Sequence, residues 1–101
     1  MDNLVCALGL KTHQGEVCLQ LALQGVKLID TKQLDYGPNN ILATGEMGCA
    51  VRAQDKVSRI LHLLNKNSTP NHESLNDSWI DLGNYATIAR ALRAGLWIPK
   101  P

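Results

Sequence analysis

The fold is decided by the stretch TGEMGCAVRAQDKVSRILHLL, residues 44–64. Its apolar side chains recur at intervals of three or four residues, which places them on one side of an α-helix. Thr44 and Glu46 stand near its start, where a hydroxyl and a carboxylate favour a helix N-terminus. The spacing therefore predicts a helix over residues 44–64 with these apolar positions: Met47, Ala50, Val51, Val57, Ile60, Leu61 and Leu64.

A further helix is predicted upstream, over residues 15–34, where apolar side chains cover more than one face. Gly25 is a weak point within it, because glycine has a low helix propensity. The run DYGPNN at residues 35–40 ends this helix, since glycine followed by proline forms a turn that a helix cannot cross.

A third helix is predicted downstream, over residues 73–94. The polar, proline-containing stretch at 65–71 separates it from the preceding helix as a surface loop. Asn71 or Ser74 is expected to cap its start, and Gly95 is expected to close it.

These elements predict an all-α fold in a single domain, residues 1–101, with a short N-terminal segment at 1–13 and a tail at 95–101. No strand pattern competes with the helices. Because their apolar residues spread beyond one stripe, we expect the three-helix unit to assemble into a homo-oligomeric bundle. Trp79 falls on an apolar face and is expected in the core, whereas Trp97 is expected to pack against a neighbouring subunit.

Composition excludes several classes of protein. The formal charge is +1, so the field that steers proteins to nucleic acid polymers is missing. Cys6, Cys18 and Cys49 do not have the spacing of a zinc or redox motif, and they are expected to be small buried hydrophobes in a reducing compartment. No run reaches the roughly 18 apolar residues of a membrane span, so we expect a soluble, cytoplasmic protein that does not enter a membrane.

Four oxygen-bearing side chains form one row on the predicted third helix, within about 80° of one another: Glu73, Asp77, Asp81 and Asn84. Carboxylates four residues apart repel, so the row requires either water or a cation. A hard cation such as Mg²⁺ takes oxygen ligands and keeps waters that phosphate oxygens can replace. The pattern therefore favours a magnesium site, with a solvated charged face as the alternative.

The predicted helix over 44–64 carries further charged residues beside its apolar stripe. If it packs against the third helix, Asp55 adds a carboxylate to the acidic row, and Lys56 and Arg59 could hold phosphate oxygens. An ordinary surface pair between Asp55 and Arg59 is the alternative interpretation.

Three motifs then follow in order: K..DYG at residues 32–37, GxxxR..DK..R at 48–59 and E...D...D..NY at 73–85. In this combination the chain resembles small MazG-like proteins. More narrowly, it is similar to the phage and bacterial nucleotide-modification-associated branch of the all-α nucleoside triphosphate pyrophosphohydrolase superfamily. The resemblance covers about residues 32–86.

The resemblance implies a helical bundle that assembles as a homodimer or homotetramer in a bacterial or phage-infected host cell. It also implies that the protein binds a nucleoside triphosphate through Mg²⁺ or Mn²⁺. Superfamily enzymes hydrolyse the α–β phosphate bond and release a nucleoside monophosphate and pyrophosphate. The catalytic and metal-binding acids implied for this chain are Asp55, Glu73, Asp77 and Asp81. The substrate-binding residues implied are Lys32, Asp35, Tyr36, Lys56, Arg59, Asn84 and Tyr85.

One difference from the better-characterised MazG-type enzymes keeps alternatives open. Those enzymes pair an ExxE helix with an ExxD helix, whereas Arg52 and Asp55 occupy the first of these spacings here. Magnesium-dependent pyrophosphohydrolysis is the leading hypothesis. A module that binds or sequesters a nucleotide without cleaving it, and a purely structural oligomeric protein, are the alternatives.

Overall fold

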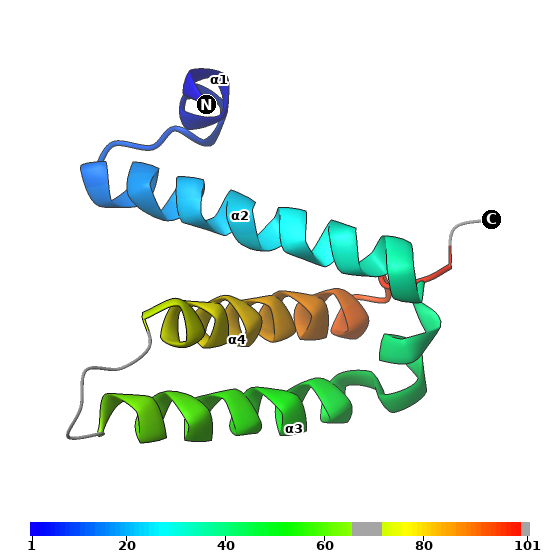
Figure 1. Ribbon diagram of the computed structural model, residues 1–101. Helices are drawn as coiled ribbons and strands as arrows, with labels where there is room; N and C mark the ends of the chain where they lie inside the picture. Colours follow the sequence, from blue (N-terminus) through cyan, green and yellow to red (C-terminus); the bar gives the residue numbers. More distant parts are fainter. Residues whose placement is uncertain (66–71, 100–101) are drawn as a thin grey trace.

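Helices make up all the regular secondary structure in the computed structural model of this chain, which describes residues 1–65 and 72–99. For His72 and Glu73 the backbone alone is described. The helices are α1 (Asp2–Leu8), α2 (His13–Tyr36), α3 (Asn39–Leu64) and α4 (His72–Arg93) (Figure 1). The all-α prediction is confirmed over the described ranges.

The start of the chain is more helical than its sequence predicts. The N-terminal segment contains α1, which ends at Gly9 in the left-handed conformation (φ 67°). This helix is only 7 residues long, too short for its periodicity to be recognised. Helix α2 begins after Thr12, whose hydroxyl accepts a hydrogen bond from the Gly15 amide at 3.0 Å.

The predicted break after α2 is present but short. Gly37 has φ 70°, and Pro38 precedes the first turn of α3, so the chain turns at these two residues. Gly45 (φ 64°, ψ −157°) then kinks α3. The predicted helix over 44–64 therefore corresponds to the long part of α3 beyond this kink, and the first turns of α3 were not predicted.

Helix α4 confirms the predicted third helix. Gly95 (φ 72°) closes it, and the Leu96 amide returns to the Ala91 carbonyl at 2.9 Å. The prediction of Ser74 as the cap is wrong, because Ser74 lies inside the helix. The other predicted cap, Asn71, and most of the predicted surface loop lie outside the described residues.

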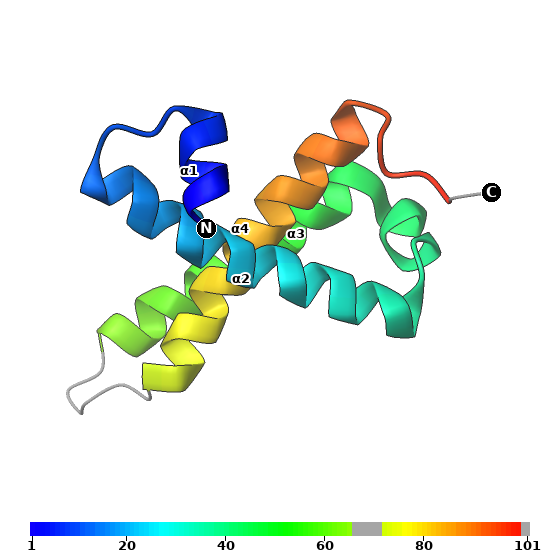
Figure 2. The same ribbon diagram turned by 90° about the horizontal axis from the view of Figure 1, so that it is seen from above.

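Helix α4 is the central element. It lies between α2 and α3 in Figure 1, runs antiparallel beside α3, and is crossed by α2 at a steep angle in Figure 2. The buried core lies where α3 and α4 meet and contains Ile41, Cys49 and Ile88. The partly buried residues packed around it are Ile29, Tyr85, Ala89, Leu92 and Trp97.

Only one of the three cysteines has the predicted buried environment. Cys49 is 2% exposed, and burial raises the pKa of its thiol because the thiolate is disfavoured away from water, although the Arg52 charge partly opposes this effect. Cys6 and Cys18 are exposed, so the prediction is wrong for them. They lie on α1 and the first half of α2, which project from the α3–α4 pair (Figure 2).

The prediction that Trp79 lies in the core is wrong for a single chain. Trp79 is 52% exposed, because the apolar face of α4 that carries it is not covered within one chain. Trp97 packs against the chain's own core, and its indole N–H donates to the Pro38 carbonyl at 3.3 Å. The tail thus braces the turn between α2 and α3.

The shape of the chain is extended for its length. Its radius of gyration is 15.7 Å, whereas a compact domain of about 100 residues has a value of about 13 Å.

None of the helices in the described ranges combines the length and the apolar character that a membrane span requires.

Gly25 is the point at which α2 crosses α4. It is the buried residue of α2, and a Cβ atom built there would lie 2.8 Å from Oδ1 of Asn84. The absence of a side chain therefore allows α2 to approach α4 closely. Gly25 is thus unfavourable for the helix itself but is needed for the packing of α2 against α4.

We predict opposite effects of substitution at the two helical glycines near this crossing. Gly25→Leu is expected to lower the free energy of unfolding by about 1–3 kcal/mol, because the new side chain meets α4. Gly83→Ala adds only a Cβ, which meets nothing within 4 Å, and is expected to raise it by up to about 1 kcal/mol through helix propensity. Urea unfolding followed by circular dichroism measures both, and equal effects would contradict the close approach.

Candidate functional site

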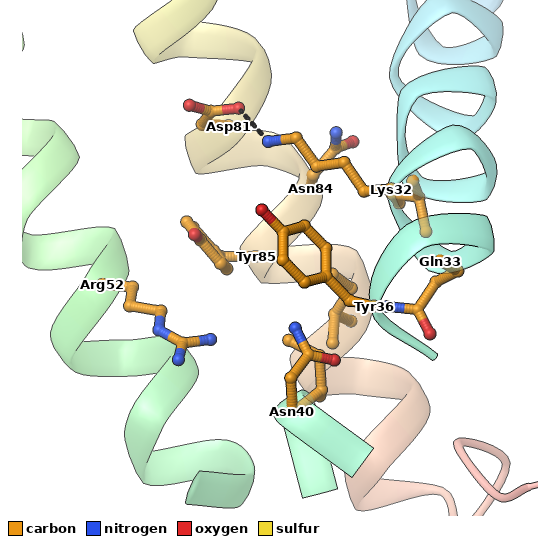
Figure 3. A pocket seen from close by; sticks show the side chains of 11 residues that line it. Lys32, Gln33, Tyr36, Asn40, Arg52, Asp81, Asn84 and Tyr85 are labelled. Carbon is orange, nitrogen blue, oxygen red and sulfur yellow. Dashed lines mark ion pairs between the residues drawn. The ribbon is translucent and has the colours of Figure 1, made fainter. Parts of the chain in front are cut away.

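A pocket of about 260 Å³ lies where α2, α3 and α4 converge (Figure 3). Its apolar wall is formed by three isoleucines: Ile29, Ile41 and Ile88. Its polar side chains are Lys32, Gln33, Tyr36, Asn40, Arg52, Asp81, Asn84 and Tyr85. We call this cavity the central pocket.

Helical spacing explains why these residues share one cavity. The lining residues of α2 fall at positions 29, 32, 33 and 36, and those of α4 at 81, 84, 85 and 88. Both sets follow the i, i+3, i+4, i+7 pattern of a single helix face. The turn at Gly37 and Pro38 then returns the chain to the pocket at Asn40, and Trp97 holds that turn through the Pro38 carbonyl.

Asp81 on α4 is the electrostatic centre of the pocket. Its Oδ2 lies 3.0 Å from Nζ of Lys56 on α3, and its Oδ1 lies 3.6 Å from Nζ of Lys32 on α2. The Asp81 and Lys56 side chains are 20% and 29% exposed, so their ion pair is less screened than a pair on the open surface, whereas the Lys32 side chain is 53% exposed. One carboxylate thus links all three helices, and Figure 3 shows Lys32 reaching across to it.

A second cavity of about 400 Å³ adjoins the central pocket through the side chains of Arg52 and Tyr85. It is more open than the central pocket, and its lining is Arg52, Asp55, Lys56, Arg59 and Tyr85. We call it the basic cavity. Arg59 is oriented by a hydrogen bond from its Nη2 to Oγ of Ser74, at 3.0 Å.

The two cavities together carry more positive than negative charge. Their lining contains two lysines, two arginines and two aspartates: Lys32, Arg52, Lys56, Arg59, Asp55 and Asp81. The chain as a whole is almost neutral, so this excess is local. An anion with several charged oxygens is the chemistry that such a surface attracts.

Most of the predicted site residues line one of these cavities. Five line the central pocket: Lys32, Tyr36, Asp81, Asn84 and Tyr85. Asp55, Lys56 and Arg59 line the basic cavity. Asp35 and Asp77 are exposed and line neither cavity, and the side chain of Glu73 lies outside the described residues.

Sequence reasoning missed three of the polar lining residues. Arg52 could have been found, because it precedes Asp55, Lys56 and Arg59 by the same helical spacing that brings these residues to one face. Gln33 could also have been found, because it shares the helix face of Lys32 and Tyr36. Asn40 carried no comparable signal, since its position depends on how the chain turns after α2.

The predicted acidic row does not gather around one point in the described part of a single chain. No group of three or more His, Cys, Asp and Glu side chains there is placed to hold a metal ion. Both oxygens of Asp81 already face lysine ammonium groups, so a cation at Asp81 has to compete with them. The Glu73 side chain, the remaining carboxylate of the row, lies outside the described residues.

Comparison of the chain with models of protein families, with curated proteins and with solved structures found no match. The resemblance to MazG-like proteins therefore rests on the three motifs and their order.

Proposed function

We propose that this protein binds a nucleoside triphosphate across the central pocket and the basic cavity. The observation that carries the proposal is the convergence of four cationic side chains and two tyrosines, from three helices, on two adjoining cavities. Charged residues that are neighbours on one helix often form nothing more than a charged surface. Here Lys32 of α2 and Lys56 of α3 both lie beside Asp81 of α4, and only the packing of the three helices brings them together.

The basic cavity suits the phosphates. Arg52 and Arg59 can each offer two parallel N–H donors to a phosphate group, and Lys56 adds a compact charge between the two cavities. Lys32 approaches the same region from α2. This arrangement can hold a chain of phosphates better than a single one, because its cations are spread over two cavities.

The central pocket suits the nucleoside. Tyr36 and Tyr85 offer aromatic faces on which a base can stack, and stacking tolerates any base. The amides of Gln33, Asn40 and Asn84 offer donors and acceptors to the edges of a base or to a sugar. Burial of Ile29, Ile41 and Ile88 beside them supplies the apolar wall typical of ligand pockets.

Magnesium-dependent hydrolysis of the bound nucleotide to a monophosphate and pyrophosphate is the second candidate, supported by the resemblance to MazG-like proteins. Mg²⁺ is usually held by one or two protein carboxylates together with substrate phosphates. Asp55 and Asp81 line the two cavities and are the carboxylates suited to this arrangement; Mn²⁺ could replace Mg²⁺. The ion would supply charge neutralisation at the phosphates.

Two lysines of α2 provide a matched test of the proposed binding. The ligand is first selected by measuring the melting temperature with each ribo- and deoxynucleoside triphosphate, in the presence of Mg²⁺ or of a chelator. Assay of released pyrophosphate in the same mixtures separates hydrolysis from binding. Calorimetric titration of that ligand is expected to give about three- to tenfold weaker binding for Lys32→Gln, which loses a charge in the pocket. Lys27→Gln, on the same helix but outside both cavities, is expected to leave the affinity unchanged.

Stabilisation by no nucleotide, or equal loss in the two variants, would contradict binding at this site. Stabilisation without pyrophosphate release under any metal condition would leave the binding proposal in place and eliminate the hydrolase.

We propose further that the chain self-associates as a homodimer or homotetramer. Its accessible surface is 7656 Å², about 2,000 Å² more than the roughly 5,600 Å² of a compact monomer of this mass. An excess of this size matches the area that one subunit contributes to a permanent dimer. Large apolar side chains are exposed on all four helices, among them Leu4, Leu21, Met47 and Trp79.

The groove between α2 and α4 is the surface best suited to a second copy. It has a volume of about 400 Å³ and contains no charged side chain among its lining residues. Leu21, Val26, Trp79 and Ile80 provide its apolar part, and Gly25 lies at its base. A surface of this kind is depleted in charge in the way that the centres of subunit interfaces are.

Sedimentation velocity tests this assembly. The wild-type chain is expected to sediment as a dimer or tetramer, and Trp79→Glu is expected to raise the dissociation constant by tenfold or more, because it places a charge in the groove. Leu34→Glu is the matched control, since Leu34 is 82% exposed on α2 and lies outside the groove. A monomeric wild type, or equal effects of both variants, would contradict the proposal.

A further inference from the structure

Asp81 has an environment that a simple metal ligand does not need. Its carboxylate lies between Lys56 of α3 and Lys32 of α2, at 3.0 and 3.6 Å. These two lysines are also cations that the proposed function assigns to a phosphate-bearing ligand. The same ammonium groups thus have an internal anion beside them before any ligand arrives.

We propose that Asp81 is an internal counter-anion of the phosphate site, which weakens the binding of anions by competing for Lys32 and Lys56. The inference rests on the proposed nucleotide binding and deepens it, because it assigns a residue that sets how tightly the site holds phosphates. Asp81 acts here through the lysines rather than by contacting the phosphates itself.

The geometry supports competition rather than shared binding. The Asp81 side chain is 20% exposed and the Lys56 side chain 29%, so their pair is partly withdrawn from solvent. A phosphate that approaches the lysines meets the negative charge of Asp81 at short range and must displace the Asp81 carboxylate from them. In the free protein the Asp81 carboxylate partly neutralises the two lysine ammonium groups, and this lowers their attraction for an anionic ligand.

The arginines of the basic cavity face a different situation. Among the ion pairs described for the two cavities, both involve Asp81 and a lysine, and neither involves Arg52 or Arg59. Arg59 instead donates to the neutral hydroxyl of Ser74. A ligand with several phosphates reaches these arginines in addition to the lysines, which compensates for the competition by Asp81. The inferred ligand is therefore a polyphosphate rather than a single phosphate group.

A pair of isosteric variants on one helix tests the proposal. Asp81→Asn and Asp77→Asn remove the same charge from α4, four residues apart, but Asp77 is exposed and lines neither cavity. The quantity to measure is the affinity for inorganic tripolyphosphate, by calorimetry with chelator present so that no divalent cation contributes. Asp81→Asn is expected to bind about three- to tenfold more tightly than wild type, and Asp77→Asn within about twofold of it.

A double-mutant cycle with Lys56→Gln provides the second measurement. The fold-increase in tripolyphosphate affinity caused by Asp81→Asn is expected to be at least about twofold smaller in the Lys56→Gln background. The reason is that one of the two lysines paired with Asp81 is already absent there. Far-ultraviolet circular dichroism checks that each variant keeps its helices. If Asp81→Asn proves unfolded, Lys56→Gln and Lys32→Gln still have to weaken tripolyphosphate binding, and failure to do so overturns the inference.

The outcomes separate this inference from the proposed function. If wild type binds tripolyphosphate and Asp81→Asn binds it equally or more weakly, Asp81 is not a competitor and the inference alone is overturned. If neither protein binds tripolyphosphate and neither binds a nucleotide, the proposed function falls together with it.

Discussion

The approach of α2 to α4 at Gly25 is the constraint on which the rest of the structure depends. Helix α3 packs along α4 over most of its length, whereas α2 touches α4 mainly around one crossing. Only because α2 lies across α4 does its last turn bring Lys32 and Tyr36 to the face that carries Asp81 and Tyr85. The central pocket is therefore a product of the crossing and not of any single helix.

The same crossing connects the ligand site to the surface that we assign to a second subunit. Asn84 lines both the central pocket and the apolar groove, and Gly25 meets it from the groove side. An interface in the groove would hold α2 against α4 from outside, while the Lys32–Asp81 pair holds it from the pocket side. Assembly would thereby support the geometry of the ligand site, and the extended shape of one chain would be stabilised by its partner.

The sequence was most informative where physical chemistry is local. Periodicity predicted α4 and the long part of α3, and glycines with positive φ mark the ends that turn chemistry predicted at residues 37 and 95. Helical spacing also brought Lys56 and Arg59 to one face, as expected. By contrast, the exposure of Trp79 could not be read from its apolar face, because burial depends on which surfaces the other helices cover.

The acidic row shows where sequence reasoning reached its limit. Spacing on α4 predicted correctly that Asp77 and Asp81 are near one another along the helix, but only the positions of α2 and α3 decide which of them faces other charges. Asp81 meets two lysines, and Asp77 remains exposed. The spacing of the row suggests one cation site, but in the folded chain Asp81 lines a pocket whose other charged residues are Lys32 and Arg52, and Asp77 lines none of the cavities described here.

The most direct test of binding across these two cavities is a nuclear magnetic resonance titration of the isotopically labelled chain with a non-hydrolysable nucleoside triphosphate. Our account predicts that the largest shifts occur at Lys32, Arg52, Lys56 and Tyr85, with the side-chain signals of the lysines and arginines among them. Shifts that concentrate in the groove around Leu21 and Trp79, or no shifts at saturating nucleotide, would contradict it.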